Sequence, residues 1–215
     1  MNDGLTMIEI VLDRSGSMRA VRNATIAGFN EFVEGQKLGF GDARMTLVQF
    51  DTEDPFEIVF DSKPVRDVPK LTIEKYVPRG GTPLHDALGY AIDSLGARLS
   101  KLPEYERPGK VVIVAMTDGL ENSSRNYTAP RIAEMIRHQR EAYSWQFVFL
   151  GANQDAILTG ERLNILAESS LTYDASAAGV QKAMRFTSSK INRMRAGFSK
   201  FVEFDKKDRD EAKQK

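Results

Sequence analysis

Apolar and polar residues follow two different periods along most of the chain. Short, nearly continuous apolar runs are typical of buried strands, whereas apolar residues that recur every three or four positions mark one face of a helix. The apolar runs cover residues 7–12, 45–50, 56–60, 111–116, 146–150 and 171–173. Helical spacing covers residues 20–35, 84–99, 132–142 and 155–166. Because the two patterns alternate, the sequence predicts a doubly wound α/β domain.

Two features of the runs predict the arrangement of the sheet. Residues 45–50 and 56–60 are joined by a short polar segment that contains Pro55, which indicates an antiparallel hairpin. The six consecutive apolar residues at 111–116 indicate a central parallel strand with both faces covered. We therefore expect residues 1–174 to form a three-layer, Rossmann-like α/β domain with a mostly parallel sheet and one antiparallel edge hairpin.

The residues after 174 carry a different pattern. Six apolar side chains and one threonine alternate spacings of four and three, at Val180, Met184, Thr187, Ile191, Met194, Phe198 and Phe201. This spacing predicts a long amphipathic helix over residues 175–204 that packs on the domain or extends it. A helix that binds a partner or an anionic surface is the alternative. Residues 205–215 are almost all charged and predict a disordered tail.

Composition narrows the class of protein. The 215 residues are 41% hydrophobic and 28% charged, as expected for one large globular domain with an appendage. Thirty basic and thirty acidic side chains cancel, so no global field favours nucleic acid, and recognition must come from a local site. The chain has no cysteine, no leader pattern and no apolar run of the ~20 residues that span a bilayer. We therefore expect a cytoplasmic protein without a transmembrane segment.

An oxygen-rich turn follows the first apolar run directly. Asp13, Ser15 and Ser17 lie at the carboxyl end of the predicted strand, where open α/β sheets bind their ligands. A carboxylate and hydroxyls are hard oxygen donors, which suit a hard cation. The turn is therefore the first candidate for a metal site.

Two further loops supply oxygen atoms for the same site. The run 111–116 leads into Asp118, which places a second carboxylate at the same edge of the sheet as Asp13. The paired glycines Gly80 and Gly81 allow close approach of the backbone and present the hydroxyl of Thr82.

The three motifs together, in this order on alternating strands and helices, resemble the metal-ion-dependent adhesion site of von Willebrand factor type A domains. The resemblance covers residues 5–174 and is strongest to compact, stand-alone prokaryotic and phage members. It implies that the hydroxyls of Ser15, Ser17 and Thr82 bind Mg²⁺ or Mn²⁺ directly. It also implies that Asp13 and Asp118 act through bound waters, and that an Asp or Glu of a partner protein takes the last position.

From this resemblance we expect a divalent-metal-dependent protein interaction module rather than an enzyme. A regulatory or accessory subunit of an ATPase or other assembly is one alternative, and a metal-dependent phosphoester hydrolase is another. An aspartyl phosphotransferase would use Asp13 as its nucleophile, but the customary second acid two residues later is Ser15 here. The sequence also lacks the P-loop and nucleophile-elbow patterns.

Structural roles compete with metal binding at each position. Ser17 and Thr82 are good helix N-caps, and Asp13 and Asp118 are ordinary polar residues of turns. His85 follows Thr82 by three residues, and we expect it to be a partly exposed structural residue.

Several arginines lie near the three motifs in sequence. They form a cationic rim that steers an acidic partner, or they are solvated surface charges. These residues are Arg14, Arg19, Arg79 and Arg125.

Overall fold

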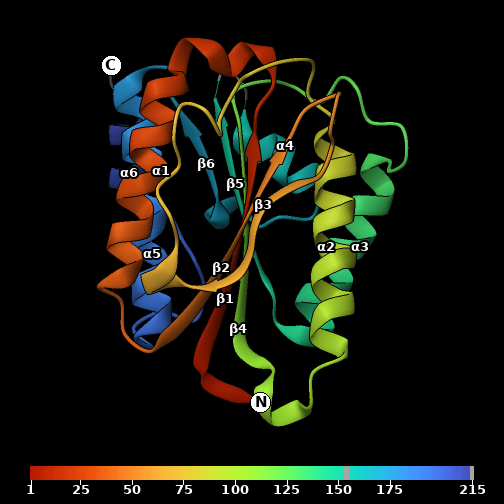
Figure 1. Cartoon of the computed structure of the whole chain (residues 1–215), viewed down its shortest axis with the longest axis vertical. Coiled ribbons are helices and arrows are strands. Elements are labelled where there is room, and N and C mark those ends of the chain that lie inside the picture. Colours follow the sequence, from red (N-terminus) through yellow and green to blue (C-terminus); the bar gives the residue numbers. More distant parts are fainter. Residues whose placement is uncertain (153–154, 214–215) are drawn as a thin grey trace.

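A six-stranded sheet forms the middle layer of the molecule (Figure 1). The computed structural model describes residues 1–152 and 155–213. The strands are β1 (Asn2–Asp13), β2 (Asp42–Phe50), β3 (Glu57–Pro64), β4 (Pro108–Thr117), β5 (Gln146–Ala152) and β6 (Ser170–Tyr173). Their order is β3-β2-β1-β4-β5-β6, and only β3 pairs antiparallel to its neighbour. The predicted three-layer α/β fold with one antiparallel edge hairpin is confirmed.

Helices cover both faces of this sheet (Figure 1). One face carries α1 (Arg22–Lys37), α5 (Ala177–Arg195) and α6 (Lys206–Ala212). The other carries α2 (Leu84–Ser100), α3 (Ala129–Tyr143) and α4 (Ala156–Arg162). Short 3-10 turns occupy Gly16–Val21, Val65–Asp67, Glu104–Glu106 and Ala167–Ser169. Among the described residues, no helix is both long and apolar enough to cross a membrane.

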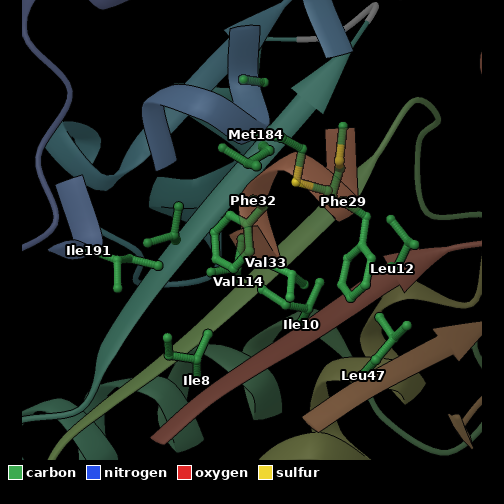
Figure 2. Packing of buried hydrophobic residues seen from close by; sticks show 14 of the residues in the cluster. Ile8, Ile10, Leu12, Phe29, Phe32, Val33, Leu47, Val114, Met184 and Ile191 are labelled. Atoms are coloured by element: carbon green, nitrogen blue, oxygen red, sulfur yellow. The ribbon is translucent and has the colours of Figure 1, made fainter. Parts of the chain in front are cut away.

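The central strand β1 supplies side chains to two cores. Ile8, Ile10 and Leu12 point toward α1 and α5, where they pack with Phe29 and other buried residues (Figure 2). Alternate residues of β1, such as Val11, point toward α2 and α3. Because both faces of β1 are buried, the strand has a nearly continuous apolar run, interrupted only by Glu9 between Met7 and Leu12.

Helix α5 packs along α1 through its apolar stripe. A Cβ on Gly35 would lie 2.5 Å from Ser188 Oγ, so glycine permits the close approach of the two helices. Gln36 Nε2 also donates to the carbonyl oxygen of Ser188 at 2.9 Å. The apolar stripe of α5 is therefore buried against the domain and is not available to bind a partner.

The predicted helix over 175–204 is longer than the observed one. Helix α5 ends at Arg195, whose Nη1 donates to the carbonyl oxygen of Gln36 at 2.7 Å. Gly197 then adopts a left-handed conformation with φ of 78°, which ends the helix. Phe198, assigned to the apolar stripe, is 77% exposed as a result.

The prediction of a disordered tail over residues 205–215 is wrong for residues 205–213. Asp205 and Asp208 form a reciprocal capping box that begins α6. Lys190 of α5 bonds both carboxylates, at 3.0 and 2.6 Å. Charged residues are therefore ordered here because they cap a helix and pair with a neighbouring one. Residues 214 and 215 lie outside the described part of the chain.

One acid interrupts the apolar run of β1. Glu9 is fully buried, and its Oε2 accepts from Arg98 Nη2 at 2.8 Å, while Oε1 has no hydrogen-bond partner within the described residues. Burial raises the pKa of Glu9 from 4.5 to about 7, and Arg98 opposes this shift. Because the folded state binds the proton more tightly than the unfolded chain, Glu9 reduces stability as pH rises from 4.5 through 7.

Glu9→Gln is expected to remove this dependence on pH. The difference in free energy of unfolding between the variant and the native chain should increase with pH. Above pH 7 it should reach about 3 kcal/mol, at roughly 1.4 kcal/mol per pKa unit. Thermal melting in EDTA between pH 5 and 8 measures the difference. The exposed Glu34→Gln change is the control. A difference that stays constant with pH would contradict the prediction.

Candidate metal centre

Three loops meet at the carboxyl ends of the parallel strands. Asp13 is the last residue of β1, and Asp118 follows the adjacent strand β4. Ser15 and Ser17 lie at the start of the 3-10 turn after β1, and Thr82 lies just before α2. The register pairs Leu12 with Met116, so the two strands end side by side.

Hydrogen bonds connect four of the five predicted ligands in a chain. Asp13 Oδ1 accepts from the amide of Ser15 at 2.6 Å. The hydroxyls of Ser15 and Ser17 lie 3.0 Å apart, and Ser17 Oγ donates to Asp118 Oδ1 at 2.5 Å. The structure therefore brings these oxygen atoms together.

The hydroxyl of Thr82 reaches the same place from the third loop. A Cβ on Gly119 would lie 3.4 Å from Thr82 Oγ1 and 3.7 Å from Ser17 Oγ. Thr82 and Ser17 thus border one small volume beside Gly119. Ser17 is exposed to solvent, whereas the other four candidate ligands are buried. The cluster is therefore accessible to solvent at Ser17.

The alternative role of the hydroxyls as helix caps is not found. The residue at the N-cap of the 3-10 turn is Ser15, and that of α2 is Pro83, and neither makes a side-chain capping bond. Ser17 bonds Ser15 and Asp118 instead. Asp13 does form a turn, through its bond from Ser15, but its other oxygen accepts from Thr117 Oγ1 at 2.5 Å.

Burial dominates the electrostatics of the two carboxylates. It raises the pKa of Asp13 from 3.8 to about 6, with hydrogen bonds from Thr117 and Ser15 opposing the shift and the charge of Asp118 adding to it. Burial also raises the pKa of Asp118. In the described part of the chain, their hydrogen bonds come from hydroxyls and amides rather than from basic side chains. An added cation would offset the cost of both charges.

Two buried tyrosines hold the ends of the strands. Tyr76 donates its hydroxyl to the carbonyl oxygen of Asp13 at 2.6 Å, and Tyr173 donates to that of Thr117 at 3.1 Å. Each phenol fixes the backbone beside a candidate ligand. No sequence motif contains these tyrosines, so the sequence analysis did not identify them.

The paired glycines before Thr82 make room for Thr52. Gly80 has φ of 62°, and a Cβ there would lie 2.3 Å from Thr52 Oγ1. That same oxygen accepts from the amide of Gly81 at 3.1 Å, while Gly80 accepts from the amide of Gly16 at 3.0 Å. The expected close approach of this loop to another group is therefore observed.

The loop after Asp118 docks on the start of α2. Asn122 exchanges two bonds with the backbone of Thr82, at 2.9 and 3.2 Å. Asp86 of α2 accepts from three consecutive amides of residues 125–127 at 2.7–2.8 Å. In return, Glu121 accepts from the amide of His85 at 2.9 Å. These contacts hold Thr82 against the end of β4.

The histidine beside the site belongs to the same docking contact. His85 Nδ1 lies 3.8 Å from Glu121 Oε2, and burial lowers the pKa of the imidazole. This position agrees with the expected structural role of His85.

The hypothesis of a cationic rim is wrong for two of its four arginines. Arg14 is buried and bonds Asp51, and Arg79 is shared between Asp51 and Glu53. Arg19 and Arg125 are exposed. Proximity in sequence did not reveal that Arg14 and Arg79 turn toward the hairpin between β2 and β3.

The donor chemistry of the cluster fits a small, hard cation. Within residues 1–152 and 155–213, no three His, Cys, Asp or Glu side chains are grouped so as to hold a metal. The cluster instead combines three hydroxyls with two carboxylates, all oxygen donors of the kind that Mg²⁺ and Mn²⁺ prefer.

The fold matches several solved structures. Proximal thread matrix protein 1 from the mussel byssus has a TM-score of 0.61 at 19% identity, over 89% of this chain and 47% of that chain. One of its structures has a zinc-occupied MIDAS motif. A von Willebrand factor type A protein from Catenulispora acidiphila has a TM-score of 0.60 at 16% identity, over 88% and 42% of the two chains. The chain has the von Willebrand factor type A fold.

A further match with this fold is the pilus adhesin SpaC from Lactobacillus rhamnosus GG, with a TM-score of 0.64 at 14% identity over 90% and 31% of the two chains. The chain spans less than half the length of each of these solved chains. Neither a family model nor a curated protein matches the sequence.

Asp118→Asn is expected to stabilise the metal-free protein. It removes a buried charge, and the amide oxygen still accepts from Ser17. Since burial raises the pKa of Asp118, the ionised form is the costly one, and the melting temperature in EDTA at pH 8 should rise. Asp93→Asn on exposed α2 surface is the control. A lower melting temperature for Asp118→Asn would count against this account of the site.

Proposed function

We propose that this chain is a divalent-metal-dependent protein interaction module that captures an Asp or Glu side chain of a partner. The supporting observation is the meeting of three hydroxyls and two buried carboxylates at one sheet edge, where Ser17 is exposed to solvent. Mg²⁺ or Mn²⁺ is the ion that this donor set suits.

The five residues would coordinate the ion in two ways, directly and through bound waters. Ser15, Ser17 and Thr82 would be direct ligands, and Asp13 and Asp118 would orient bound waters. When bound, the ion supplies a strong electrophile for a carboxylate, because neutral hydroxyl ligands leave most of its charge uncancelled. The exposed hydroxyl of Ser17 marks the side from which the partner approaches.

Exposed positive charge in the same segments as Ser17 and Asp118 supports an acidic partner. Arg19 and Arg125 are exposed and lie on the loops that carry Ser17 and Asp118. Such cations increase the rate at which a negatively charged partner associates. The balanced net charge gives no support to nucleic acid as the partner. The absence of cysteine agrees with a cytoplasmic, reducing compartment.

Two other functions remain as alternatives. A regulatory or accessory subunit of an ATPase or other assembly would use the same metal-bridged contact. A phosphoester hydrolase would need a free nucleophile or base, yet both oxygens of Asp13 accept hydrogen bonds and the imidazole of His85 lies toward Glu121. The geometry therefore favours binding over hydrolysis.

Mg²⁺ and Mn²⁺ are expected to stabilise the native chain against heat. A tenfold excess of free metal over its dissociation constant adds about 1.4 kcal/mol, which corresponds to roughly 3–6 °C in a chain of this size. Melting with each metal and with EDTA measures the shift. The Ser15→Ala/Asp118→Ala double variant should show none, and the matched Ser100→Ala/Asp93→Ala variant should respond like the native chain. No shift at millimolar metal would refute the metal site.

The Mn²⁺-loaded chain is expected to bind a simple carboxylate. With protein in excess over metal, the methyl resonance of acetate should broaden, because acetate takes the position proposed for the partner's side chain. EDTA and the double variant should both abolish the broadening.

In pull-downs, the partner should be retained by the native chain with Mg²⁺ and lost with the double variant. Retention that is equal in EDTA would contradict metal-bridged capture.

A further inference from the structure

Asp51 is a fully buried carboxylate immediately after β2, outside the motifs that predict the metal site. Its Oδ1 accepts from the amides of Glu53 and Asp54, at 2.7 and 3.0 Å. Asp51 therefore closes the turn at the tip of the hairpin between β2 and β3 with one oxygen, which leaves its other oxygen for longer-range contacts.

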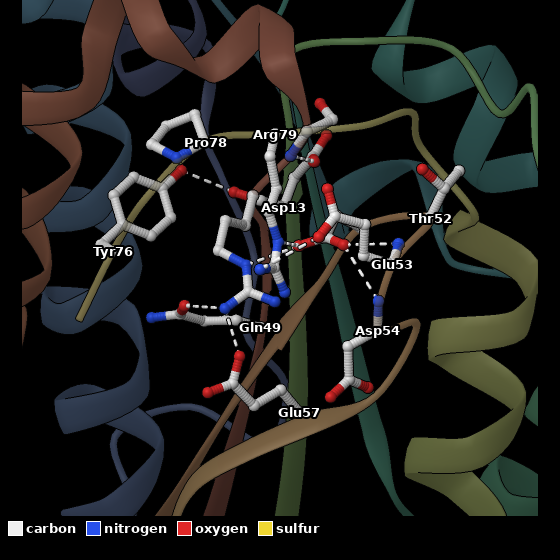
Figure 3. A network of polar contacts seen from close by, with 12 residues as sticks. Asp13, Gln49, Thr52, Glu53, Asp54, Glu57, Tyr76, Pro78 and Arg79 are labelled. Carbon is white, nitrogen blue, oxygen red and sulfur yellow. Dashed lines mark hydrogen bonds and ion pairs between the residues drawn. The ribbon is translucent and has the colours of Figure 1, made fainter. Parts of the chain in front are cut away.

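That second oxygen joins two loops of the candidate metal centre. Asp51 Oδ2 accepts from Arg14 Nε at 2.7 Å and from Arg79 Nε at 2.9 Å (Figure 3). Arg14 lies between Asp13 and Ser15 in the first loop, and Arg79 belongs to the loop that ends in Thr82. One carboxylate oxygen thus holds a side chain from each of two ligand-bearing loops.

Backbone bonds show that these loops and the hairpin form one unit. The amide of Arg14 donates to Phe50 at 2.9 Å, and the amide of Arg79 donates to the carbonyl oxygen of Arg14 at 2.8 Å. Thr52, next to Asp51, supports the loop before Thr82 through the amide of Gly81. The tip of the hairpin therefore forms hydrogen bonds with both loops and supports them.

The network is not explained by stability alone. Arg14 also donates to Gln49 at 3.2 Å and pairs with Glu57, while its Nη2 has no partner within the described residues. A buried ion pair costs about as much in desolvation as it gains, so apolar replacements are often neutral or stabilising. What the charged network supplies is a fixed geometry for the two arginines.

We propose that Asp51 is a positioning residue for the metal centre, which sets the separation between the serine loop and the Thr82 loop through Arg14 and Arg79. This inference rests on the proposed function. Direct ligands of a small cation must lie at nearly fixed distances, so a shift of one loop weakens binding without removing any ligand.

Asp51→Asn tests this role because it keeps the size of the side chain and the turn-closing oxygen. It removes the charge that attracts the two arginines. Calorimetric titration of the full chain with Mn²⁺ should show a 10–100-fold weaker affinity, the range found when residues that orient metal ligands are changed. Asp67→Asn is the control, since this exposed carboxylate pairs with Arg66 rather than with Arg14 or Arg79. Its Mn²⁺ affinity should stay within about threefold of native.

Melting in EDTA separates positioning from a structural role. A lower melting temperature for Asp51→Asn with native Mn²⁺ affinity would overturn the proposal. Arg79→Gln provides a second, safer variant, because this side chain is 40% exposed. It should weaken Mn²⁺ binding, whereas Arg66→Gln, on an exposed ion pair away from the site, should not. If the native chain itself bound no Mn²⁺, the proposed function would be refuted. Native Mn²⁺ affinity in both Asp51→Asn and Arg79→Gln would refute only the role of Asp51.

Discussion

Two buried carboxylates are the main electrostatic constraint at the carboxyl edge of this sheet. Asp13 and Asp118 follow neighbouring parallel strands, and burial disfavours the charged form of both. Their hydrogen bonds come from Ser15, Ser17 and Thr117, which stabilise negative charge without cancelling it. A bound cation would offset the repulsion and the desolvation together. Without a bound cation, the two buried charges therefore lower the stability of the fold. Binding sites commonly reduce stability in this way.

Arg14 does not supply that compensation, although it lies in the loop that carries Asp13 and Ser15. Arg14 lies between Asp13 and Ser15 in sequence, yet its guanidinium turns to Asp51 and Glu57. A guanidinium bonded to Asp13 would neutralise the carboxylate and occupy the space beside the hydroxyls. The acidic residues of the hairpin therefore keep Arg14 away from the site as well as anchoring its loop. Both effects leave the cluster rich in oxygen and accessible from the side of Ser17.

The fold was predictable because its signals are local and repeated. Alternating apolar runs and helical spacings identified the six strands and the covering helices other than α6, since burial on two faces imposes those periods. The errors lie where local signals compete. The apolar spacing that continues to Phe198 and beyond outlasts helix α5, because Gly197 ends the helix first. Charge suggested disorder after residue 204, but Asp205 and Asp208 at capping spacing begin a helix.

The ligand oxygens were predictable for a related reason, since each belongs to a short motif at the end of a strand or the start of a helix. The residues that orient them are distant in sequence: Asp51 is 37 residues from Arg14 and 28 from Arg79. No period or motif encodes such pairs, because they depend on how loops pack. One hint existed, as the glycine at Gly80 indicated close approach of another group, which is Thr52. Oxygens bind a small cation only when their separations are held, so the contacts that we propose to fix those separations are the ones that no motif in the sequence predicts.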